Sequence, residues 1–180
     1  MIIHINGMPG VGKLTVAKLL AAQLNARLID NHLVIDLVLS LCERGSEDYV
    51  VLIQKFTGVI LNEIAEKSDQ LYIFTNALAA ESAKDMERLD QIRLFASKNK
   101  IPFVQVLLSC DLAENRRRVA SENRKLKGKL MNEDELEALH KNYSIYHPPT
   151  ELNLKIDTTS LSANDVSEQI RNYIRKIKEF

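Results

Sequence analysis

The chain has no tryptophan, only two cysteines and four prolines, and no excess of one charge, since 24 Lys and Arg balance 24 Asp and Glu. Cys42 and Cys110 are far apart and match no metal-ligand spacing, so we expect two reduced thiols rather than a disulfide framework or a zinc site. The neutral balance gives no reason to expect bulk electrostatic binding to nucleic acid or to anionic membranes.

Long apolar segments and low-complexity segments are also missing. No stretch approaches the roughly 18 apolar residues of a membrane span, and the first residues show no basic region and no cleavable signal. No repeat and no Gly/Ser-rich linker divides the chain. We therefore expect a cytoplasmic protein with one domain over residues 1–180, a length that suits a single core.

What is present is an alternation of short apolar runs and amphipathic segments. Strands are predicted over residues 2–5, 27–30, 71–75, 101–108 and 154–156. Helices are predicted over 13–25, 33–42 and 81–98, and after the capping residues Ser46, Asp111, Asn132 and Ser162. Five buried strands separated by helices indicate an α/β fold with a parallel sheet covered on both faces. Ligands of such sheets bind beyond the carboxyl ends of the strands.

The strongest motif is a glycine-rich segment between the first strand and the first helix. Glycines let the backbone turn tightly and approach phosphates closely, and the helix N-terminus adds N–H donors and a positive dipole end. A lysine at the position of Lys13 reaches the β- and γ-phosphates. The motif in this context predicts a P-loop that binds ATP, rather than a turn that binds nothing. Its nucleotide-binding residues are Gly7, Pro9, Gly10, Val11, Gly12, Lys13, Leu14 and Thr15.

One position departs from the general pattern G-x-x-x-x-G-K-[ST]. Leu14 follows the lysine, and the hydroxyl comes one residue later, at Thr15. Leu14 offers a backbone N–H but no ligand for Mg²⁺. We therefore expect Mg²⁺ to be held by phosphates, waters and a carboxylate from elsewhere, since this ion keeps several waters in proteins.

The pattern G-x-P-G-x-G-K-x-T resembles the loop of adenylate kinase and its relatives, where the residue after the lysine also lacks a hydroxyl. In the order of its elements the chain resembles the small P-loop kinases: shikimate kinase, gluconate kinase, chloramphenicol phosphotransferase and the nucleoside monophosphate kinases. The resemblance implies a three-layer fold with a five-stranded sheet in the order 2-3-1-4-5. It also implies ATP and Mg²⁺ as cofactors.

The second strand ends in Asp30-Asn31-His32, which topology places beside the P-loop. Shikimate kinase carries Asp-x-Asp at the equivalent strand end, so the resemblance implies that Asp30 takes the first position and His32 replaces the second. Asp30 would orient a Mg²⁺-bound water or the acceptor, and His32 would take the acceptor's proton, because histidine titrates near neutral pH. Alternatively, Asp30 or Asn31 caps the next helix and His32 is a surface histidine.

Two further residues belong to neighbouring strands. Asn76 follows the third strand, which lacks the carboxylate of a Walker B motif. It is a candidate for hydrogen bonding to the acceptor, while simple strand termination explains it equally well. His4, inside the first strand, is expected to be a packed core histidine.

A basic segment follows the fourth strand, with seven Lys or Arg and one acidic residue over residues 116–129. The resembled kinases carry a lid here, so the resemblance implies a lid over about 116–131 in which Arg118 and Arg124 close over the phosphates. A solvated basic helix face is one alternative. Contact with nucleic-acid phosphates is another, although the segment lacks the interleaved aromatics that base stacking needs.

The fifth strand ends in an Ile-Asp-Thr-Thr segment that also occurs in several of the resembled kinases. There the loop after this strand passes the adenine ring, so the resemblance implies that Thr158 and Thr159 contact adenine through their backbone. The same residues are equally compatible with a strand followed by a helix cap.

Together these features predict a phosphotransferase that moves the γ-phosphate of ATP to a hydroxyl of a small molecule, with neither membrane nor nucleic acid among its partners. A nucleoside monophosphate kinase would need arginines near residues 33–60, where Arg44 and Lys55 are the basic residues. Arg88 and Arg93 lie in a helix predicted to pack on the sheet. A nucleotide-binding switch without transfer is the third alternative. The sequence leaves the acceptor and the oligomeric state open.

Overall fold

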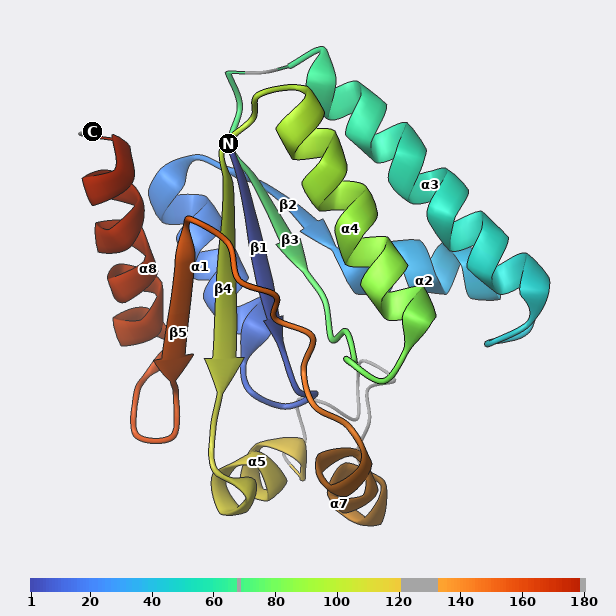
Figure 1. The fold of residues 1–180 in the computed structure, drawn as a ribbon. Coiled ribbons are helices and arrows are strands. Elements are labelled where there is room, and N and C mark those ends of the chain that lie inside the picture. Colours follow the sequence, from blue (N-terminus) through green and yellow to red (C-terminus); the bar gives the residue numbers. More distant parts are fainter. Residues whose placement is uncertain (68, 121–132, 179–180) are drawn as a thin grey trace.

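The computed structural model describes residues 1–67, 69–120 and 133–178 (Figure 1). Five strands form one sheet: β1 (Ile2–Gly7), β2 (Arg27–Asp30), β3 (Tyr72–Thr75), β4 (Phe103–Ser109) and β5 (Asn153–Asp157). Neighbouring strands pair in parallel, in the order β2-β3-β1-β4-β5. The predicted fold class and strand order are confirmed.

Helices lie on both faces of the sheet. They are α1 (Lys13–Leu24), α2 (Asn31–Leu39), α3 (Glu47–Ala65), α4 (Ala83–Lys98), α5 (Leu112–Val119), α7 (Glu133–Asn142) and α8 (Ala163–Lys178). α1 and α8 cover one face, α3 and α4 cover the other, and α5 and α7 lie beyond the carboxyl ends of the strands (Figure 1). None of these helices, over the residues that the structure describes, is long and apolar enough to cross a bilayer.

The core consists of two apolar layers because successive strand residues point to opposite faces. Ile3 and Ile5 of β1 pack with α1 and α8, whereas Ile2 of β1 and Phe74 of β3 pack with α3 and α4. All six residues of β1 are buried. A strand covered on both faces reads as a continuous apolar run, which explains why the sequence predicts it well.

Polar side chains interrupt the layer that faces α4. His4 of β1 and Gln105 of β4 are register partners, and both are fully buried. Two residues further along β1, the Asn6 side chain donates to Tyr146 O at 2.9 Å and accepts from Leu78 N at 3.1 Å. Asn6 thereby ties the segment between α7 and β5, which crosses in front of β4 in Figure 1, to the loop after β3.

Side-chain caps set where several helices begin. Ser46 Oγ accepts from Tyr49 N at 3.1 Å, and Asp111 Oδ1 accepts from Glu114 N at 2.7 Å, as predicted for these two starts. α2 begins at Asn31, two residues earlier than predicted, because Asp30 is its N-cap. The predicted cap Asn132 lies outside the described residues, as do Arg124 and most of the predicted lid.

Candidate active site

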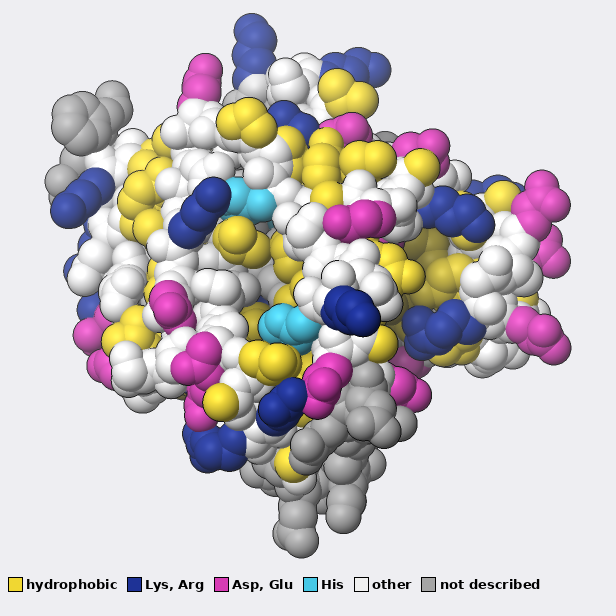
Figure 2. All heavy atoms as spheres, turned by 60° about the horizontal axis from the view of Figure 1, so that its bottom comes forward, with side chains coloured by type: hydrophobic (Ala, Val, Ile, Leu, Met, Phe, Trp, Pro, Cys, Tyr) yellow, Lys and Arg dark blue, Asp and Glu magenta, His cyan; other side chains and the backbone are white. Residues whose placement is uncertain are grey.

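A cavity of about 1620 Å³ lies at the carboxyl ends of the strands. It is bordered by the P-loop, the end of β2 with the start of α2, the end of β3, α5 with α7, and the loop between β5 and α8. Figure 2 shows this end of the molecule, where acidic, basic and hydrophobic side chains are interspersed. The cavity therefore lies where parallel sheets bind their ligands.

The P-loop has a backbone that glycine favours at two positions. Gly10 and Gly12 have φ values of 98° and 97°, in the left-handed region. A Cβ on Gly10 would lie 2.1 Å from Asn115 Oδ1. Gly12 is the N-cap of α1 and, as a glycine, makes no side-chain cap hydrogen bond at this helix start, which borders the cavity. Such a helix N-terminus is suited to an anion.

Lys13 is the first residue of α1 and lines the cavity. Its Nζ donates to Gly7 O at 2.7 Å and to Met8 O at 2.8 Å, which bends the side chain back over the loop. The ammonium group therefore lies against the loop backbone, and its predicted contact with the β- and γ-phosphates stays a prediction. Leu14 and Thr15 also line the cavity.

Gly7 is buried at the end of β1 and is not part of the cavity lining. A Cβ there would lie 2.4 Å from Leu108 O of β4, so close packing between the strands accounts for this glycine. Its predicted contact with nucleotide stays a prediction.

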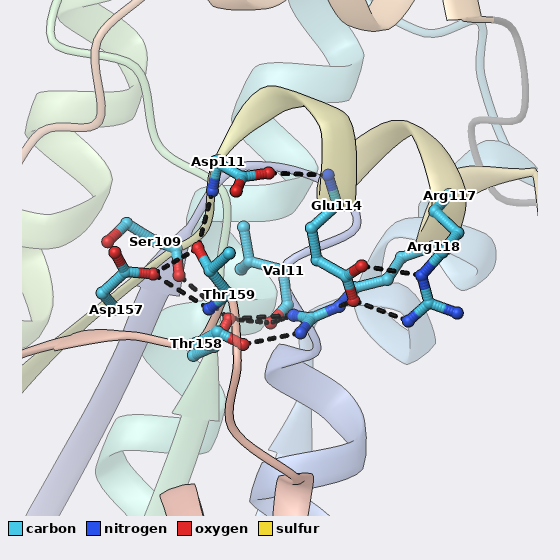
Figure 3. A network of polar contacts seen from close by, with 9 residues as sticks. All are labelled: Val11, Ser109, Asp111, Glu114, Arg117, Arg118, Asp157, Thr158 and Thr159. Carbon is cyan, nitrogen blue, oxygen red and sulfur yellow. Dashed lines mark hydrogen bonds and ion pairs between the residues drawn. The ribbon is translucent and has the colours of Figure 1, made fainter.

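Arg118 of α5 connects the P-loop to the loop after β5 (Figure 3). Its Nη1 donates to Val11 O at 3.2 Å and to Thr158 Oγ1 at 2.8 Å, and its Nη2 donates to Thr158 O at 2.6 Å. Nε donates to Glu114 Oε1 at 2.7 Å. The guanidinium thus holds together three segments that border the cavity. Its predicted closure over the phosphates stays a prediction.

Glu114 is the anionic partner in this network. Hydrogen bonds from Arg117 and Arg118 lower the pKa of Glu114 to about 2. The carboxylate is therefore ionised throughout the neutral range, and it keeps Arg118 oriented toward the P-loop.

Thr158 and Thr159 line the cavity, but their backbone N–H groups have partners within the protein. Thr158 N donates to Ser109 O at 2.7 Å, and Thr159 N donates to Asp157 Oδ1 at 2.9 Å. Hydrogen bonds from these two N–H groups to adenine would have to replace existing ones. The predicted adenine contacts stay a prediction.

α7 borders the cavity beside α5, with Glu135 and Leu139 in the lining. It is held to α5 by Asn115, whose Nδ2 lies 2.9 Å from His140 Nε2, and by an ion pair between Arg116 and Glu137. Since Asn115 also lies against Gly10, α5 links α7 to the P-loop.

The opposite wall of the cavity contains the predicted acceptor residues Asp30, His32 and Asn76. Asp30 Oδ1 accepts from His32 N at 3.2 Å and from Thr75 Oγ1 at 3.3 Å. The capping interpretation of Asp30 is therefore observed, and the cap still leaves the residue in the cavity wall. His32 is exposed and also lines the cavity. The catalytic roles of both residues stay predictions.

Two donors contact this wall from behind, one fully buried and one partly buried, and the sequence by itself connected neither of them to it. His4 Nε2 lies 3.0 Å from Asn76 Oδ1, and Arg88 Nη2 donates a hydrogen bond to Asn31 Oδ1. Burial lowers the pKa of His4 to about 4, and burial also lowers the pKa of Arg88. A histidine inside an otherwise apolar strand is the signal in the sequence that points to His4.

The donor set suits Mg²⁺ held mostly by phosphates and water. In the described ranges, no group of three or more His, Cys, Asp or Glu side chains is placed to hold a metal ion. Asp30 is an acidic side chain in the wall beside the P-loop. One carboxylate together with phosphate oxygens and waters is a common environment for Mg²⁺, so the residues present fit the ion.

Comparison with known proteins gives a family and a fold. The model of the AAA domain family AAA_18 matches residues 3–140. No curated protein matches the sequence. Among solved structures, a gluconokinase from Sinorhizobium meliloti 1021 is 13% identical with a TM-score of 0.65, covering 98% of this chain and 93% of that one.

Two further structures are similar over the whole length. The APS kinase CysC of Mycobacterium tuberculosis, in complex with AMPPNP and APS, is 16% identical with a TM-score of 0.61, covering 97% of this chain and 96% of that one. A shikimate kinase from Bacteroides thetaiotaomicron is 23% identical with a TM-score of 0.60, covering 100% of this chain and 99% of that one. With most of its length matched by the family model, the chain belongs to the AAA domain family AAA_18 and has the fold of the small P-loop kinases.

Proposed function

We propose that this protein transfers the γ-phosphate of ATP to a hydroxyl group of a small molecule. The observation that carries the proposal is that one cavity joins the P-loop to a wall with Asp30, His32 and Asn76. The similar structures named as gluconokinase, APS kinase and shikimate kinase support the same reaction class. A cytoplasmic location and a single domain over residues 1–180 remain predictions from the sequence.

At the phosphate end, Lys13 and the N–H groups at the start of α1 would bind the β- and γ-phosphates. Phosphoryl transfer spreads negative charge over the equatorial oxygens, so preorganised donors and cations lower the barrier. Bound Mg²⁺ supplies further charge neutralisation, and Asp30 would hold it through a water. Arg118 is already oriented toward the P-loop, and Arg124 is proposed as a second lid arginine over about 116–131.

At the acceptor end, Asp30 and His32 would receive the hydroxyl group. Either side chain is suited to accept its proton as the oxygen attacks the γ-phosphorus, and Asn76 would hydrogen-bond the acceptor. Arg44 is a cation in the same part of the cavity, where it also lies 5.9 Å from the centre of the Tyr49 ring. Since Arg88 lies behind the wall and is engaged with Asn31, Arg44 is the cation that we expect to meet the acceptor, which favours a neutral or weakly charged acceptor over a nucleoside monophosphate.

The test is label transfer from γ-labelled ATP, with Mg²⁺, to nucleosides, nucleoside monophosphates, sugars, sugar acids, shikimate and amino alcohols. We expect label in one class of hydroxyl compound. Measurable ATP binding without transfer to any of them would contradict the proposal and favour a nucleotide-binding switch. His32→Ala and Asp30→Asn then separate the two candidate bases, since the loss of the base slows transfer while ATP affinity changes little.

A further inference from the structure

Asn31 and Asn76 line the proposed acceptor end of the cavity, and each is held from behind by a donor, one partly buried and one fully buried. Asn31 is the first residue of α2 and is bonded to Arg88 of α4. Asn76 follows β3, is 4% exposed, and is bonded to His4 of β1. In both cases the hydrogen-bonded amide atom is the oxygen Oδ1, so each asparagine turns its oxygen toward the donor behind it.

The orientation of the Asn31 amide follows from the chemistry of arginine. A guanidinium has five N–H donors and no acceptor, so only the amide oxygen can face Arg88. The NH₂ group, at the other end of the planar amide, is then directed away from Arg88. The guanidinium and this hydrogen bond are partly buried, which limits replacement by water and favours one orientation of the amide.

The orientation of the Asn76 amide follows from the burial of His4. This side chain is fully buried and its pKa is lowered to about 4, so near neutral pH the ring carries one N–H. His4 Nδ1 has no hydrogen-bond partner among the described residues. An unpaired buried N–H costs more than an unpaired acceptor, so the proton belongs on Nε2, which donates to Asn76 Oδ1.

Both amides then present NH₂ donors at the wall that also contains Asp30. We propose that His4 and Arg88 are positioning residues that aim the NH₂ groups of Asn76 and Asn31 into the cavity, and that the acceptor carries further oxygen atoms beside the hydroxyl that receives the phosphate. This inference rests on the proposed function. The acceptor class is a polyhydroxylated molecule, sugar-like or acid-bearing, whose neighbouring oxygens accept two hydrogen bonds.

An amine at the neighbouring position would be rejected by the same arrangement. An ammonium group has donors only, so it would face the two NH₂ groups without a hydrogen bond. A site built for a polar group discriminates strongly against an analogue that leaves its donors unpaired. We expect the hydroxyl compound to exceed its amino analogue at least roughly tenfold in kcat/KM.

The experiment uses matched probes that differ in one neighbouring group: D-gluconate with 2-amino-2-deoxy-D-gluconate, and D-glucose with D-glucosamine. Label transfer from γ-labelled ATP is measured for the wild-type protein and for Asn31→Asp. The substitution keeps the size and the oxygen that faces Arg88, but replaces the NH₂ donor by an acceptor. We expect it to shift the preference toward the amino probe at least roughly tenfold, while the KM for ATP is unchanged.

His4 is tested by a pair of variants. His4→Leu removes the donor to Asn76 and is expected to raise the KM for the hydroxyl probe roughly tenfold with an unchanged KM for ATP. His4→Gln keeps an N–H donor of similar reach and should restore most of the loss. If His4→Leu does not fold, the result with Asn31→Asp decides alone. An unchanged preference in Asn31→Asp, or equal use of both probes by the wild type, overturns the inference.

Calorimetry separates this inference from the proposed function. Each probe is titrated into the wild-type protein with Mg²⁺ and the non-hydrolysable ATP analogue AMPPNP. Binding of the hydroxyl probes without any label transfer would support the orientation of the amides while contradicting the transfer reaction. Transfer of label to the amino probes in preference to the hydroxyl probes would support the transfer reaction while contradicting the orientation of the amides. If the protein binds neither member of any pair, the inference is overturned.

Discussion

At the proposed phosphate end of the cavity, one continuous stretch of chain, Pro9 to Thr15, forms much of the lining. At the acceptor end, the wall comes from separate elements, with Asn31 and Arg88 57 positions apart and His4 and Asn76 72 positions apart. A site that binds through backbone N–H groups keeps its binding groups when nearby side chains are substituted. A site built from pairs of side chains changes its ligand preference when one member of a pair is substituted. We expect common chemistry at the first end and specificity at the second.

The largest expected effect separates the two ends directly. Lys13→Ala removes the cation of the phosphate end and should lower the rate of label transfer on the order of 100- to 1,000-fold, as for other lost stabilising groups. Lys55→Ala, on the exposed surface of α3, is the control and should behave as wild type. A folded Lys13→Ala protein that keeps both ATP affinity and transfer would rule out the assignment of the phosphate site.

Packing beneath the P-loop is tested by two glycines with similar backbones. A Cβ at Gly10 meets Asn115 Oδ1 at 2.1 Å, whereas a Cβ at Gly45, with φ 82°, meets no atom within 4 Å. Gly10→Ala adds overlap to backbone strain and should lower the free energy of unfolding by about 3 kcal/mol. Gly45→Ala adds strain alone, about 1 kcal/mol.

Denaturant unfolding measures both glycine variants. If the two variants lose the same free energy of unfolding, Asn115 of α5 does not pack tightly against Gly10. The proposed link from α7 through α5 to the P-loop would then be contradicted.

Acid should lower the free energy of unfolding, because His4, behind the proposed acceptor end of the cavity, is buried in its neutral form. Its pKa is lowered by burial from the usual 6.5 to about 4. The unfolded chain therefore binds the proton more tightly, and the stability present above pH 6.5 is lost as pH falls toward 4. Between pH 7 and pH 5 the loss should be about 2 kcal/mol.

The check is urea unfolding of wild type and His4→Gln at pH 7 and pH 5. The variant lacks the titrating ring, so its stability should fall less between the two values. His147, whose pKa is also lowered by burial, contributes to the dependence that remains in both proteins. Parallel pH profiles for the two proteins would show that His4 is protonated without cost.

The smallest effect concerns two neighbouring arginines of α5. The Arg118 side chain is 21% exposed and joins Val11 to Thr158, whereas the Arg117 side chain is 74% exposed and contacts Glu114. Arg118→Ala should lower the free energy of unfolding by about 1–2 kcal/mol, since its hydrogen bonds are partly shielded from solvent. Arg117→Ala should leave the Tm unchanged. Equal shifts in thermal unfolding would show that the bonds to Val11 and Thr158 add nothing.

Local patterns in the sequence predicted much of the fold. Short runs rich in apolar residues predicted the five strands, and the caps Ser46 and Asp111 predicted two helix starts. The glycine-rich motif and the element order predicted the sheet order, through the resemblance to small P-loop kinases. The strands, the caps and the glycine-rich motif depend on neighbours in the chain, so a linear pattern is enough to detect them, whereas the sheet order came from the resemblance alone.

The partners of Arg118, His4 and Arg88 were not predicted. The assignment of Arg118 to the phosphates stays a prediction, and its hydrogen bond to Thr158, 40 positions away, was not foreseen. His4 was assigned to the core, and its bond to Asn76 depends on β1 and β3 being neighbours. Such pairs follow from strand register and helix packing, which no single stretch of sequence encodes.

By itself, the sequence determined the P-loop and the alternation of strands and helices, because glycine backbone freedom, helix caps and strand hydrophobicity act over a few residues. Only the tertiary structure decided which side chains back the acceptor wall and how Asn31 and Asn76 are oriented. The physical reason is that a buried donor selects the orientation of an amide only once packing has excluded water, and that packing exists only in the folded chain.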